Sequence, residues 1–431
     1  MSSDLPGIGD WHSFAELRLL QDRLLPAVLE RASRSPFYRG RPAAEQSAGL
    51  AERALTTKSD LRDSYPFGML AVDRDQLATY HESSGSTGTP TPSYYTEREW
   101  VDLAERFARK SVPMSSADTL LVRIPYALVI AGHLAHQAGL MKGATVIAGD
   151  CRTMAAPYSR IIRVLHDLGV SLTWSTASEC LVWAAGARLA GYDPGRDFPA
   201  LRALYVGGEP LSGARRDRIT ELWNAPVVEE YGCTEVGTMA GTCPHGRMHF
   251  WADRVLPEIL DPDTGEVTRE GTGRLVITPL HREAMPLLRY NLEDQVELRH
   301  EECPCGWYLP TVRVLGRVAH GLTVAGRGVS PLQVEEAVFR LPAEYGVLFW
   351  RGRAEPGLLR VQLEVADAYA GDACAEAARH LKEVLDVPAE VTALPPGSLV
   401  PEPLLLGRLD AMKPRKLFGP DEDWDAAVLA G

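Results

Sequence analysis

A run of small polar residues, Ser83-Ser84-Gly85-Ser86-Thr87-Gly88-Thr89-Pro90, has a composition suited to holding an anionic ligand. Glycine lets backbone N–H groups approach a ligand closely, and the hydroxyls add hydrogen-bond donors to the same surface. Such a loop suits a polyphosphate. It is not a Walker A loop, because no Gly-Lys-Ser/Thr follows at the required spacing. The alternative is a polar surface loop, and the motifs elsewhere in the chain are needed to distinguish the two interpretations.

Four further residues could hold a metal ion. Cys303 and Cys305 are separated only by a proline, and Cys243 and His249 lie on a segment that could pair with them. Two close pairs of soft or borderline ligands suit a tetrahedral structural zinc. Reduced thiols in turns are the alternative. The remaining cysteines have no partner of this kind in the sequence, and we interpret them as small apolar residues: Cys151, Cys180, Cys233 and Cys374.

Length and charge limit the classes of protein to consider. The chain has 431 residues, which predicts two or three domains, and a net charge of −12, which argues against a general nucleic-acid or anionic-membrane binder. The N-terminus lacks a basic region followed by an apolar core, and no apolar stretch approaches membrane-spanning length. Seven cysteines without a secretion signal suggest reduced thiols. We therefore expect a cytoplasmic protein.

The elements that must position these residues alternate along the first half of the chain. Predicted strands at 119–125, 144–148, 170–174, 201–206 and 227–229 are separated by amphipathic helices. Regular alternation predicts a helix-covered, mostly parallel sheet. Ligands bind to such sheets at the carboxyl ends of the strands, where 207–210 and 230–232 are expected to lie.

The pattern changes at Met248, where short strands joined by turns predict a barrel-like β subdomain over 248–315. We place it within a large N-terminal domain, 1–315. A short mixed pattern follows, and it predicts a small α+β lid over 316–431, which is within the usual size of a domain.

An ordered series of motifs begins with Thr56–Pro90 and continues as far as Arg317: Gly208-Glu209-Pro210, Tyr231-Gly232-Cys233-Thr234-Glu235, Leu256-Pro257-Glu258-Ile259 with Asp261–Glu266, Glu283–Tyr290, Cys303-Pro304-Cys305-Gly306 and Gly316-Arg317. With this series the chain resembles the phenylacetate–coenzyme A ligases, members of the adenylate-forming superfamily. Each motif alone is weak, and the ordered set is specific. It implies the adenylate-forming enzyme fold, an α/β large domain with a mobile α+β lid.

The resemblance also implies roles for individual residues. The residues expected to bind ATP are Ser84, Gly85, Ser86, Thr87, Gly88, Gly208, Glu209, Pro210, Glu230, Tyr231, Gly232, Thr234, Asp294 and Arg317. Within this set Tyr231 would stack near adenine and Asp294 would accept from the ribose hydroxyls. Glu235 would bind Mg²⁺. The catalytic residues would be Glu235, Arg317 and a C-terminal lysine, Lys413 first and Lys416 second. A carboxylate that attacks a phosphate must overcome charge repulsion, so the cation and the lysine would supply positive charge. Some relatives also carry a zinc site at the position of Cys243, His249, Cys303 and Cys305.

The chain departs from the family pattern in three places. Thr89 stands where many relatives have lysine, Ala319-His320 stand where they carry an acidic hinge pair, and the motif around Lys413 is irregular. These departures put the timing of lid rotation and the identity of the lysine in doubt.

We therefore expect ATP-dependent activation of an aryl, heteroaryl or arylacetic acid through an acyl-adenylate, followed by thioester formation with coenzyme A. Transfer to a carrier-protein thiol or an amine is the alternative, and a non-catalytic nucleotide-binding regulator is the third hypothesis. A homodimer is also considered. The acid pocket is expected at Tyr126, His133, Ala177, Val206 and Gly207. An inward-facing His133 would favour a hydroxylated, amino or heteroaryl acid.

Overall fold

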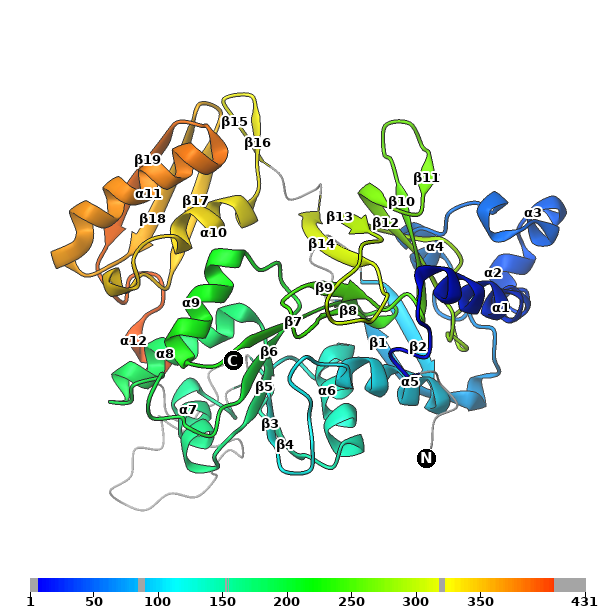
Figure 1. Ribbon diagram of the computed structural model, residues 1–431, viewed down its shortest axis with the longest axis horizontal. Coiled ribbons are helices and arrows are strands. Elements are labelled where there is room, and N and C mark those ends of the chain that lie inside the picture. The colour runs from blue at the N-terminus through cyan, green and yellow to red at the C-terminus, as the bar shows by residue number, and fades with distance from the viewer. Residues whose placement is uncertain (1–6, 84–89, 152, 154, 318–321, 407–431) are drawn as a thin grey trace, which may run out of the picture.

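The computed structural model describes residues 7–83, 90–151, 153, 155–317 and 322–406. Figure 1 shows a large central body and a smaller unit (yellow to orange) beside it. No helix within the described ranges combines the length and the apolar character needed to cross a membrane.

The chain begins with helices that pack on the edge of the central body. They are α1 (Phe14–Ala32), α2 (Pro36–Arg39), α3 (Ala43–Ser47) and α4 (Lys58–Asp63). Ser13 caps α1 by accepting from the backbone N–H of Glu16, and apolar residues spaced along the helix, such as Leu17 and Val28, are buried. Gln21 of α1 donates to the carbonyl of Ala252, which anchors the helix to the central body.

Two antiparallel strands, β1 (Leu77–Glu82) and β2 (Pro92–Thr96), flank the predicted polyphosphate loop. Glu82 lies opposite Pro92, and Thr91 donates its backbone N–H to the Ser83 hydroxyl. The base of the loop is therefore held by a hairpin, whereas residues 84–89 lie outside the described residues.

The predicted parallel sheet is present. It contains β3 (Thr119–Val122), β4 (Thr145–Ala148), β5 (Leu172–Ser175), β6 (Ala203–Val206) and the start of β7 (Val227–Cys233). Helices cover both faces: α5 (Glu97–Ala108) and α6 (Ile130–Met141) on one, and α7 (Tyr158–Asp167), α8 (Ala177–Leu189) and α9 (Gly213–Trp223) on the other. The inner strands β5 and β6 are buried along their whole length, and β3 is buried except at Thr119, as expected of a parallel sheet covered on both faces.

Antiparallel strands extend the same sheet rather than forming a body separate from it. They are β8 (Gly237–Thr242), β9 (Met248–Phe250), β10 (Val255–Leu260), β11 (Val267–Thr268), β12 (Gly271–Pro279), β13 (Tyr290–Arg299) and β14 (Thr311–Arg317). The strand order is β11-β10-β12-β13-β14-β9-β8-β7-β6-β5-β3-β4. The expected β subdomain is thus antiparallel, but it begins at β8, before Met248, because β7 pairs with β6 and β8 along its length.

The smaller unit has a core of its own, built from residues such as Val338, Val361 and Leu381. Its elements are β15 (Leu322–Val324), β16 (Arg327–Val329), α10 (Pro331–Phe339), β17 (Trp350–Glu355), β18 (Leu358–Glu364), α11 (Ala370–Leu385), β19 (Ala389–Leu394) and α12 (Glu402–Leu406). β18 pairs antiparallel with β17 and parallel with β19.

The smaller unit contacts the central body through α10, which lies on α9 (Figure 1), and through α12, which lies against α7 and α8. Phe339 and Leu348 of the smaller unit also join the core around α7, α8 and α9. Glu335 accepts from the backbone N–H of Ser212 at 3.0 Å and from the Arg215 guanidinium at 2.8 Å. Glu336 accepts from the backbone N–H of Ala214 at 3.0 Å. Carboxylates at a helix N-terminus are favoured by its unpaired amides and its dipole, so α9 and α10 form an electrostatic docking contact.

Candidate active site

Two adjoining cavities open where the parallel strands end. The outer cavity, of about 870 Å³, is lined by residues that include Pro210, Tyr231 and Arg313. The inner cavity, of about 320 Å³, is lined by residues that follow β3 and β5, such as Ile124 and Thr176. The two cavities share Gly208, Glu230, Gly232 and Asp294. This is the edge at which parallel sheets bind ligands.

Tyr231 and Asp294, both predicted to bind nucleotide, are in contact in the outer cavity. The Tyr231 hydroxyl donates to Oδ2 of Asp294 at 2.7 Å, which joins β7 to β13 across 63 positions of sequence. Asp294 lies opposite Arg317 in the β13–β14 pair, so the backbone of Arg317 is also at this edge. The structure therefore brings together these residues of three separate motifs.

Glu235, the predicted magnesium ligand, lies in the inner cavity and is 4% exposed. Its Oε1 accepts from the hydroxyls of Thr91 and Tyr290, each at 2.8 Å. Burial, with the Glu235 charge beside it, raises the pKa of Tyr290 well above its ordinary value, so the phenol stays a neutral donor. Both hydrogen bonds fall on Oε1, so they fix the orientation of the carboxylate. Neither Thr91 nor Tyr290 was assigned a role from the sequence, although Tyr290 ends one of the recognised motifs.

Glu209 contributes to the outer cavity differently from its neighbours Gly208 and Pro210. Its carboxylate accepts from the Ser178 backbone N–H at 2.6 Å and from Arg215 at 2.8 Å. Gly208 has φ +80°, a conformation that favours glycine. The side chain of Glu209 is thus tied to α8 and α9, while the 208–210 segment shapes the cavity wall.

Glu230 points into a buried ion pair. Its carboxylate accepts from the Lys110 ammonium and, at 2.7 Å, from the Thr238 hydroxyl. The remaining motif residues Gly232 and Thr234 line the inner cavity. Lys110 and Thr238 were missed from the sequence, where a lysine at a helix end and a threonine in a strand give no signal of their own.

One part of the wall of the inner cavity is apolar, and it differs in its residues from the predicted acid pocket. It is formed by Ile124, Pro125, Val129, Ile130, Ala131, Leu134 and Trp174. None of the five predicted residues lines this cavity. His133 is exposed and bonds through Nε2 to the Tyr126 carbonyl, and the Tyr126 hydroxyl contacts His136. Ala177 and Val206 belong to the core on the other face of the sheet. A Cβ at Gly207 would lie 2.6 Å from Trp174, so this glycine allows close packing behind the cavity wall.

The residue pattern of α6 explains why His133 does not line the inner cavity. Ile130, Leu134 and Ala138 repeat at intervals of four, and His133 and Gln137 repeat on the neighbouring stripe. The apolar stripe is buried and the histidine stripe is not, as helical amphipathicity would have indicated.

Several predicted residues lie outside the described part of the chain. They are Ser84, Gly85, Ser86, Thr87 and Gly88 of the loop, Thr89, Ala319, His320, and the two candidate lysines Lys413 and Lys416. For Arg317 the backbone alone is placed.

The predicted cysteine–histidine cluster is assembled between β8, β9 and the turn that follows β13. The ligand atoms of Cys243, His249, Cys303 and Cys305 all lie within 4.8 Å of one another. Cys243 Sγ and Cys303 Sγ are 3.8 Å apart, and Cys305 Sγ is 3.4 Å from His249 Nε2. Nδ1 of His249 is 2.8 Å from the Leu309 carbonyl, so the Nδ1–H tautomer leaves Nε2 as a ligand atom.

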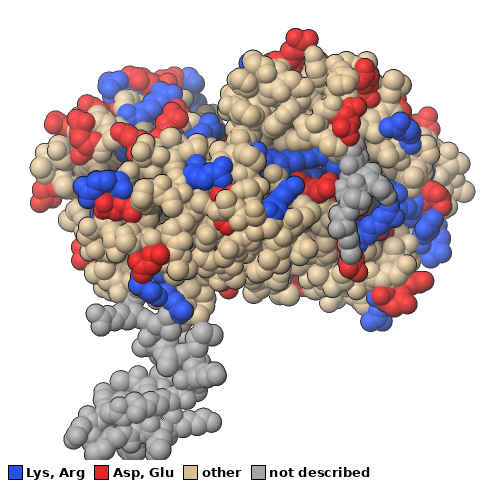
Figure 2. All heavy atoms as spheres, turned by 60° about the horizontal axis from the view of Figure 1, so that its bottom comes forward, with Lys and Arg blue, Asp and Glu red and all other residues tan. Residues whose placement is uncertain are grey.

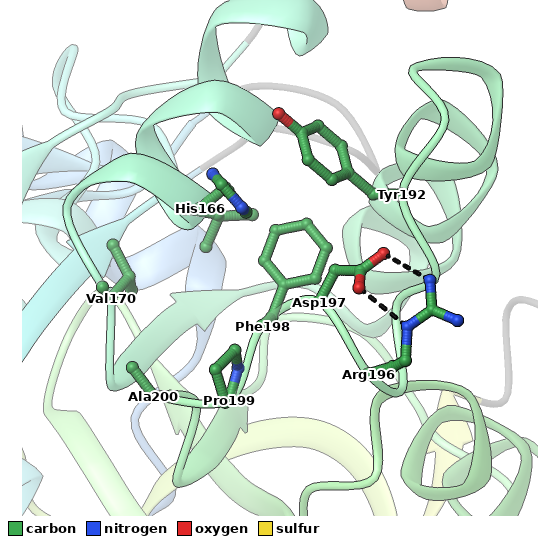
Figure 3. A pocket seen from close by; sticks show the side chains of 10 residues that line it. His166, Val170, Tyr192, Arg196, Asp197, Phe198, Pro199 and Ala200 are labelled. Atoms are coloured by element: carbon green, nitrogen blue, oxygen red, sulfur yellow. Dashed lines mark hydrogen bonds and ion pairs between the residues drawn. The ribbon is translucent and has the colours of Figure 1, made fainter.

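A further hollow, of about 580 Å³, lies at the opposite edge of the sheet (Figure 3). The rings of His166, Tyr192 and Phe198 face one another there, beside the ion pair of Arg196 with Asp197. Its other lining residues precede β5 and β6 and therefore lie at the amino ends of these strands. That edge is not the one at which parallel sheets place catalytic loops.

Charges of both signs are interspersed on the face shown in Figure 2, and basic and acidic side chains meet in its central hollow. Mixed charge around a hollow favours a small ligand over a polyanion bound along a surface.

Comparisons with known proteins agree with this geometry. The family model described as AMP-binding enzyme matches residues 26–279. A phenylacetate–coenzyme A ligase of Thermus thermophilus is 32% identical over 89% of this chain and 93% of its own length. The phenylacetate–coenzyme A ligase of Escherichia coli K12 is 30% identical over 76% of this chain and 77% of its own length.

Solved structures show the same fold. A 2-hydroxyisobutyryl-CoA ligase in the postadenylation state, in complex with 2-HIB-AMP, superposes with a TM-score of 0.81 over 93% of this chain and 92% of that chain, at 21% identity. The anthranilate CoA ligase AuaEII in complex with anthranoyl-AMP superposes with a TM-score of 0.56 over 75% of this chain and 64% of that chain, at 15% identity. The match over 26–279 and the identity along most of the chain place this protein in the AMP-binding enzyme family, as an adenylate-forming enzyme like the phenylacetate–coenzyme A ligases.

Proposed function

We propose that this enzyme activates a carboxylic acid in two steps. The acid carboxylate attacks the α-phosphate of ATP to form an acyl-adenylate and release pyrophosphate. The thiol of coenzyme A then attacks the acyl carbon, which forms the thioester and releases AMP. The observation that carries this proposal is that the outer and inner cavities meet at Gly208, Glu230, Gly232 and Asp294. A nucleotide in one and an acid in the other would have their reacting groups side by side.

Each cavity offers groups suited to its ligand. Asp294, held by Tyr231, is placed to accept from ribose hydroxyls, and the 208–210 segment would border the base. A carboxylate is the ligand type that Mg²⁺ prefers, so Glu235 fits a magnesium ion. The ion would supply positive charge near the phosphates. The loop at 84–88, Arg317 and the adenylation lysine, Lys413 or Lys416, complete the proposal as predictions.

The four-residue cluster fits a structural zinc ion. Two sulfurs bound tetrahedrally to one zinc at ~2.3 Å would be about 3.8 Å apart, and the Cys243–Cys303 separation is 3.8 Å. Four protein ligands would close the coordination sphere, so the metal would tie β8 and β9 to the β13–β14 turn and take no part in the reaction.

The division of the chain at residue 316 is also part of this proposal. The smaller unit has its own core, and it meets the central body through ion pairs and hydrogen bonds at α9 and α10, apolar residues such as Phe339 and Leu348, and α12 against α7 and α8. Such an interface allows the unit to act as a mobile lid. Transfer to a carrier-protein thiol or an amine, a homodimer and a cytoplasmic location stay predictions.

Magnesium-dependent ATP–pyrophosphate exchange tests the first step. The folded protein is assayed with a panel of aryl, heteroaryl, arylacetic and aliphatic acids, and exchange is expected with at least one of them. A second assay with coenzyme A should then yield the acyl thioester. Exchange without a thioester would favour another acceptor, and no exchange with any acid would favour a non-catalytic regulator.

A further inference from the structure

The wall of the inner cavity includes Glu230, whose carboxylate forms a buried ion pair with Lys110. The side chains of Lys110 and Glu230 are 1% and 5% exposed, and Thr238 as a whole residue is 1% exposed. Glu230 and Thr238 line the cavity. A carboxylate and an ammonium taken out of water together cost several kcal/mol each before their attraction offsets the loss, so apolar side chains of similar volume would often serve stability as well. Stability alone therefore does not explain the Lys110–Glu230 pair, and we consider a role in ligand binding.

The direction of the Glu230 side chain follows from strand geometry. Side chains two residues apart in a strand lie on the same face. Val228 belongs to one buried cluster with Ile124, Ile130, Leu134 and Trp174, and all four of these also line the inner cavity. Glu230 is on the same face of β7, so its carboxylate, and not only its backbone, lies on the cavity side.

Lys110 holds this carboxylate from behind. Its Nζ lies 4.1 Å from the centroid of the Phe107 ring and 5.6 Å from that of Trp174. Aromatic faces attract a cation and leave it few other polar partners. The ammonium therefore donates to Glu230, and Thr238 donates to the other carboxylate oxygen.

The Glu230 carboxylate keeps capacity to accept further hydrogen bonds. Two carboxylate oxygens offer about four acceptor sites, and Lys110 and Thr238 occupy two of them. We propose that the acid activated here carries an amino or hydroxyl group on its ring, which donates to Glu230 in the inner cavity. This inference rests on the proposed activation of a carboxylic acid.

The same contact would exclude the unsubstituted acid. An apolar ring against Glu230 would remove water from a charged group and give no hydrogen bond in return. Sites built to hydrogen-bond a substrate group discriminate against the analogue that lacks it by about 10⁴–10⁵ in the best cases. We expect a preference of about a hundredfold or more in kcat/KM, because Lys110 and Thr238 keep the carboxylate partly satisfied.

The test compares acids in matched pairs in the ATP–pyrophosphate exchange assay. The ring positions 2, 3 and 4 of benzoic acid and of phenylacetic acid are each substituted with an amino or a hydroxyl group, and each product is compared with its parent. At least one substituted acid should exceed its parent by about a hundredfold in kcat/KM. If a parent acid is used as well as all its substituted forms, this inference is overturned and the proposed function stands. If none of these acids supports exchange, this inference is overturned, and the proposed function is overturned as well only if the wider panel of aryl, heteroaryl, arylacetic and aliphatic acids also gives no exchange.

Variants connect the preference to these residues. Lys110→Met with Glu230→Leu replaces the pair by apolar side chains, and the substituted-to-parent ratio should fall to within about tenfold of unity. Thr238→Val and Glu230→Gln are milder changes that should each lower the ratio, and they keep the test valid if the double variant does not fold. The control, Arg109→Met with Asp253→Leu, removes a neighbouring buried pair that does not line the cavity. The control should keep the wild-type ratio, and an unchanged ratio in all the Glu230 and Thr238 variants would overturn the assignment.

Discussion

Glu235 is a buried carboxylate of the inner cavity, and its proposed role is to bind a magnesium ion. Thr91 and Tyr290 donate to the same oxygen, Oε1, and so set the direction of the other. Replacing Glu235 with Gln keeps the size of the side chain but removes the negative charge. We expect pyrophosphate exchange to fall by about a hundredfold or more, because charge stabilisation in the transition state is lost. Near-normal exchange in a folded Glu235→Gln variant would remove this residue from the metal role.

His81 is the residue from which we expect a pH effect on stability. It is 3% exposed, in β1, and burial lowers its pKa to about 4, with the neighbouring His133 adding to the decrease. A histidine of lowered pKa binds its proton more readily in the unfolded chain. Its contribution to stability is therefore complete above pH ~6.5 and is lost as the pH falls towards about 4, by at most ~1.4 kcal/mol per pH unit.

Melting temperatures measured from pH 4 to pH 8 check this expectation. In the His81→Asn variant, the melting temperature should fall less steeply below pH ~6.5 than in the wild type. His166→Asn removes a histidine that is 38% exposed and serves as the control, with the wild-type slope expected. If the melting temperature changes equally with pH in the wild type and both variants, His81 does not contribute to the pH dependence of stability.

At the scale of elements, the cysteine–histidine cluster brings the end of β8 and strand β9 together with the turn between β13 and β14. We expect purified protein to hold about one zinc per chain, and a chelator to lower the melting temperature, because a structural metal contributes folding energy directly. Cys305→Ser should have the same effect as chelation, whereas Cys374→Ser in α11 should not. Protein without zinc, and with melting unchanged by chelator, would contradict the assignment.

The elements also show what could and could not be predicted from sequence. Alternating apolar strands and amphipathic helices sufficed to predict the parallel sheet. The order of the motifs sufficed to predict that Tyr231, Glu235 and Asp294 would line one site, and their roles there stay predictions. Strand pairing was not predictable: nothing local indicates that β7 continues into an antiparallel partner, or that Thr238 lies opposite Gly232. The contact of Lys110 with Glu230 spans 120 positions of sequence, because Lys110 follows α5, which packs on the face of the sheet. The buried face of α6 could have been predicted from its apolar stripe, which includes Ile130 and Leu134. His133 was instead predicted to lie in the acid pocket, and it is exposed.

At the scale of the whole molecule, Glu335 links the smaller unit to the active site. It pairs with Arg215, and Arg215 also donates to Glu209, beside the outer cavity. The Arg215 and Glu335 side chains are 6% and 11% exposed. Removing one partner of a buried pair costs about 3–5 kcal/mol, so Glu335→Gln should weaken docking and shift the molecule towards extended forms.

Small-angle scattering of the substrate-free protein checks this, with a larger radius of gyration expected for Glu335→Gln. Glu383→Gln in α11 is the control, since it breaks an exposed pair with Arg379. Identical scattering from the wild type and both variants would contradict a docking role for Glu335.

The contact between α9 and α10 has a consequence for backbone amides. The first amides of a helix have no acceptor within it, and in α9 those of Ser212 and Ala214 use carboxylates from α10 instead. When α10 departs, these N–H groups meet solvent and can exchange their protons for deuterium. Deuterium uptake at the start of α9 would thus report how often the smaller unit leaves the central body, without an attached probe. Substrates that hold α10 in place should slow that uptake, while the interior of the sheet exchanges as before.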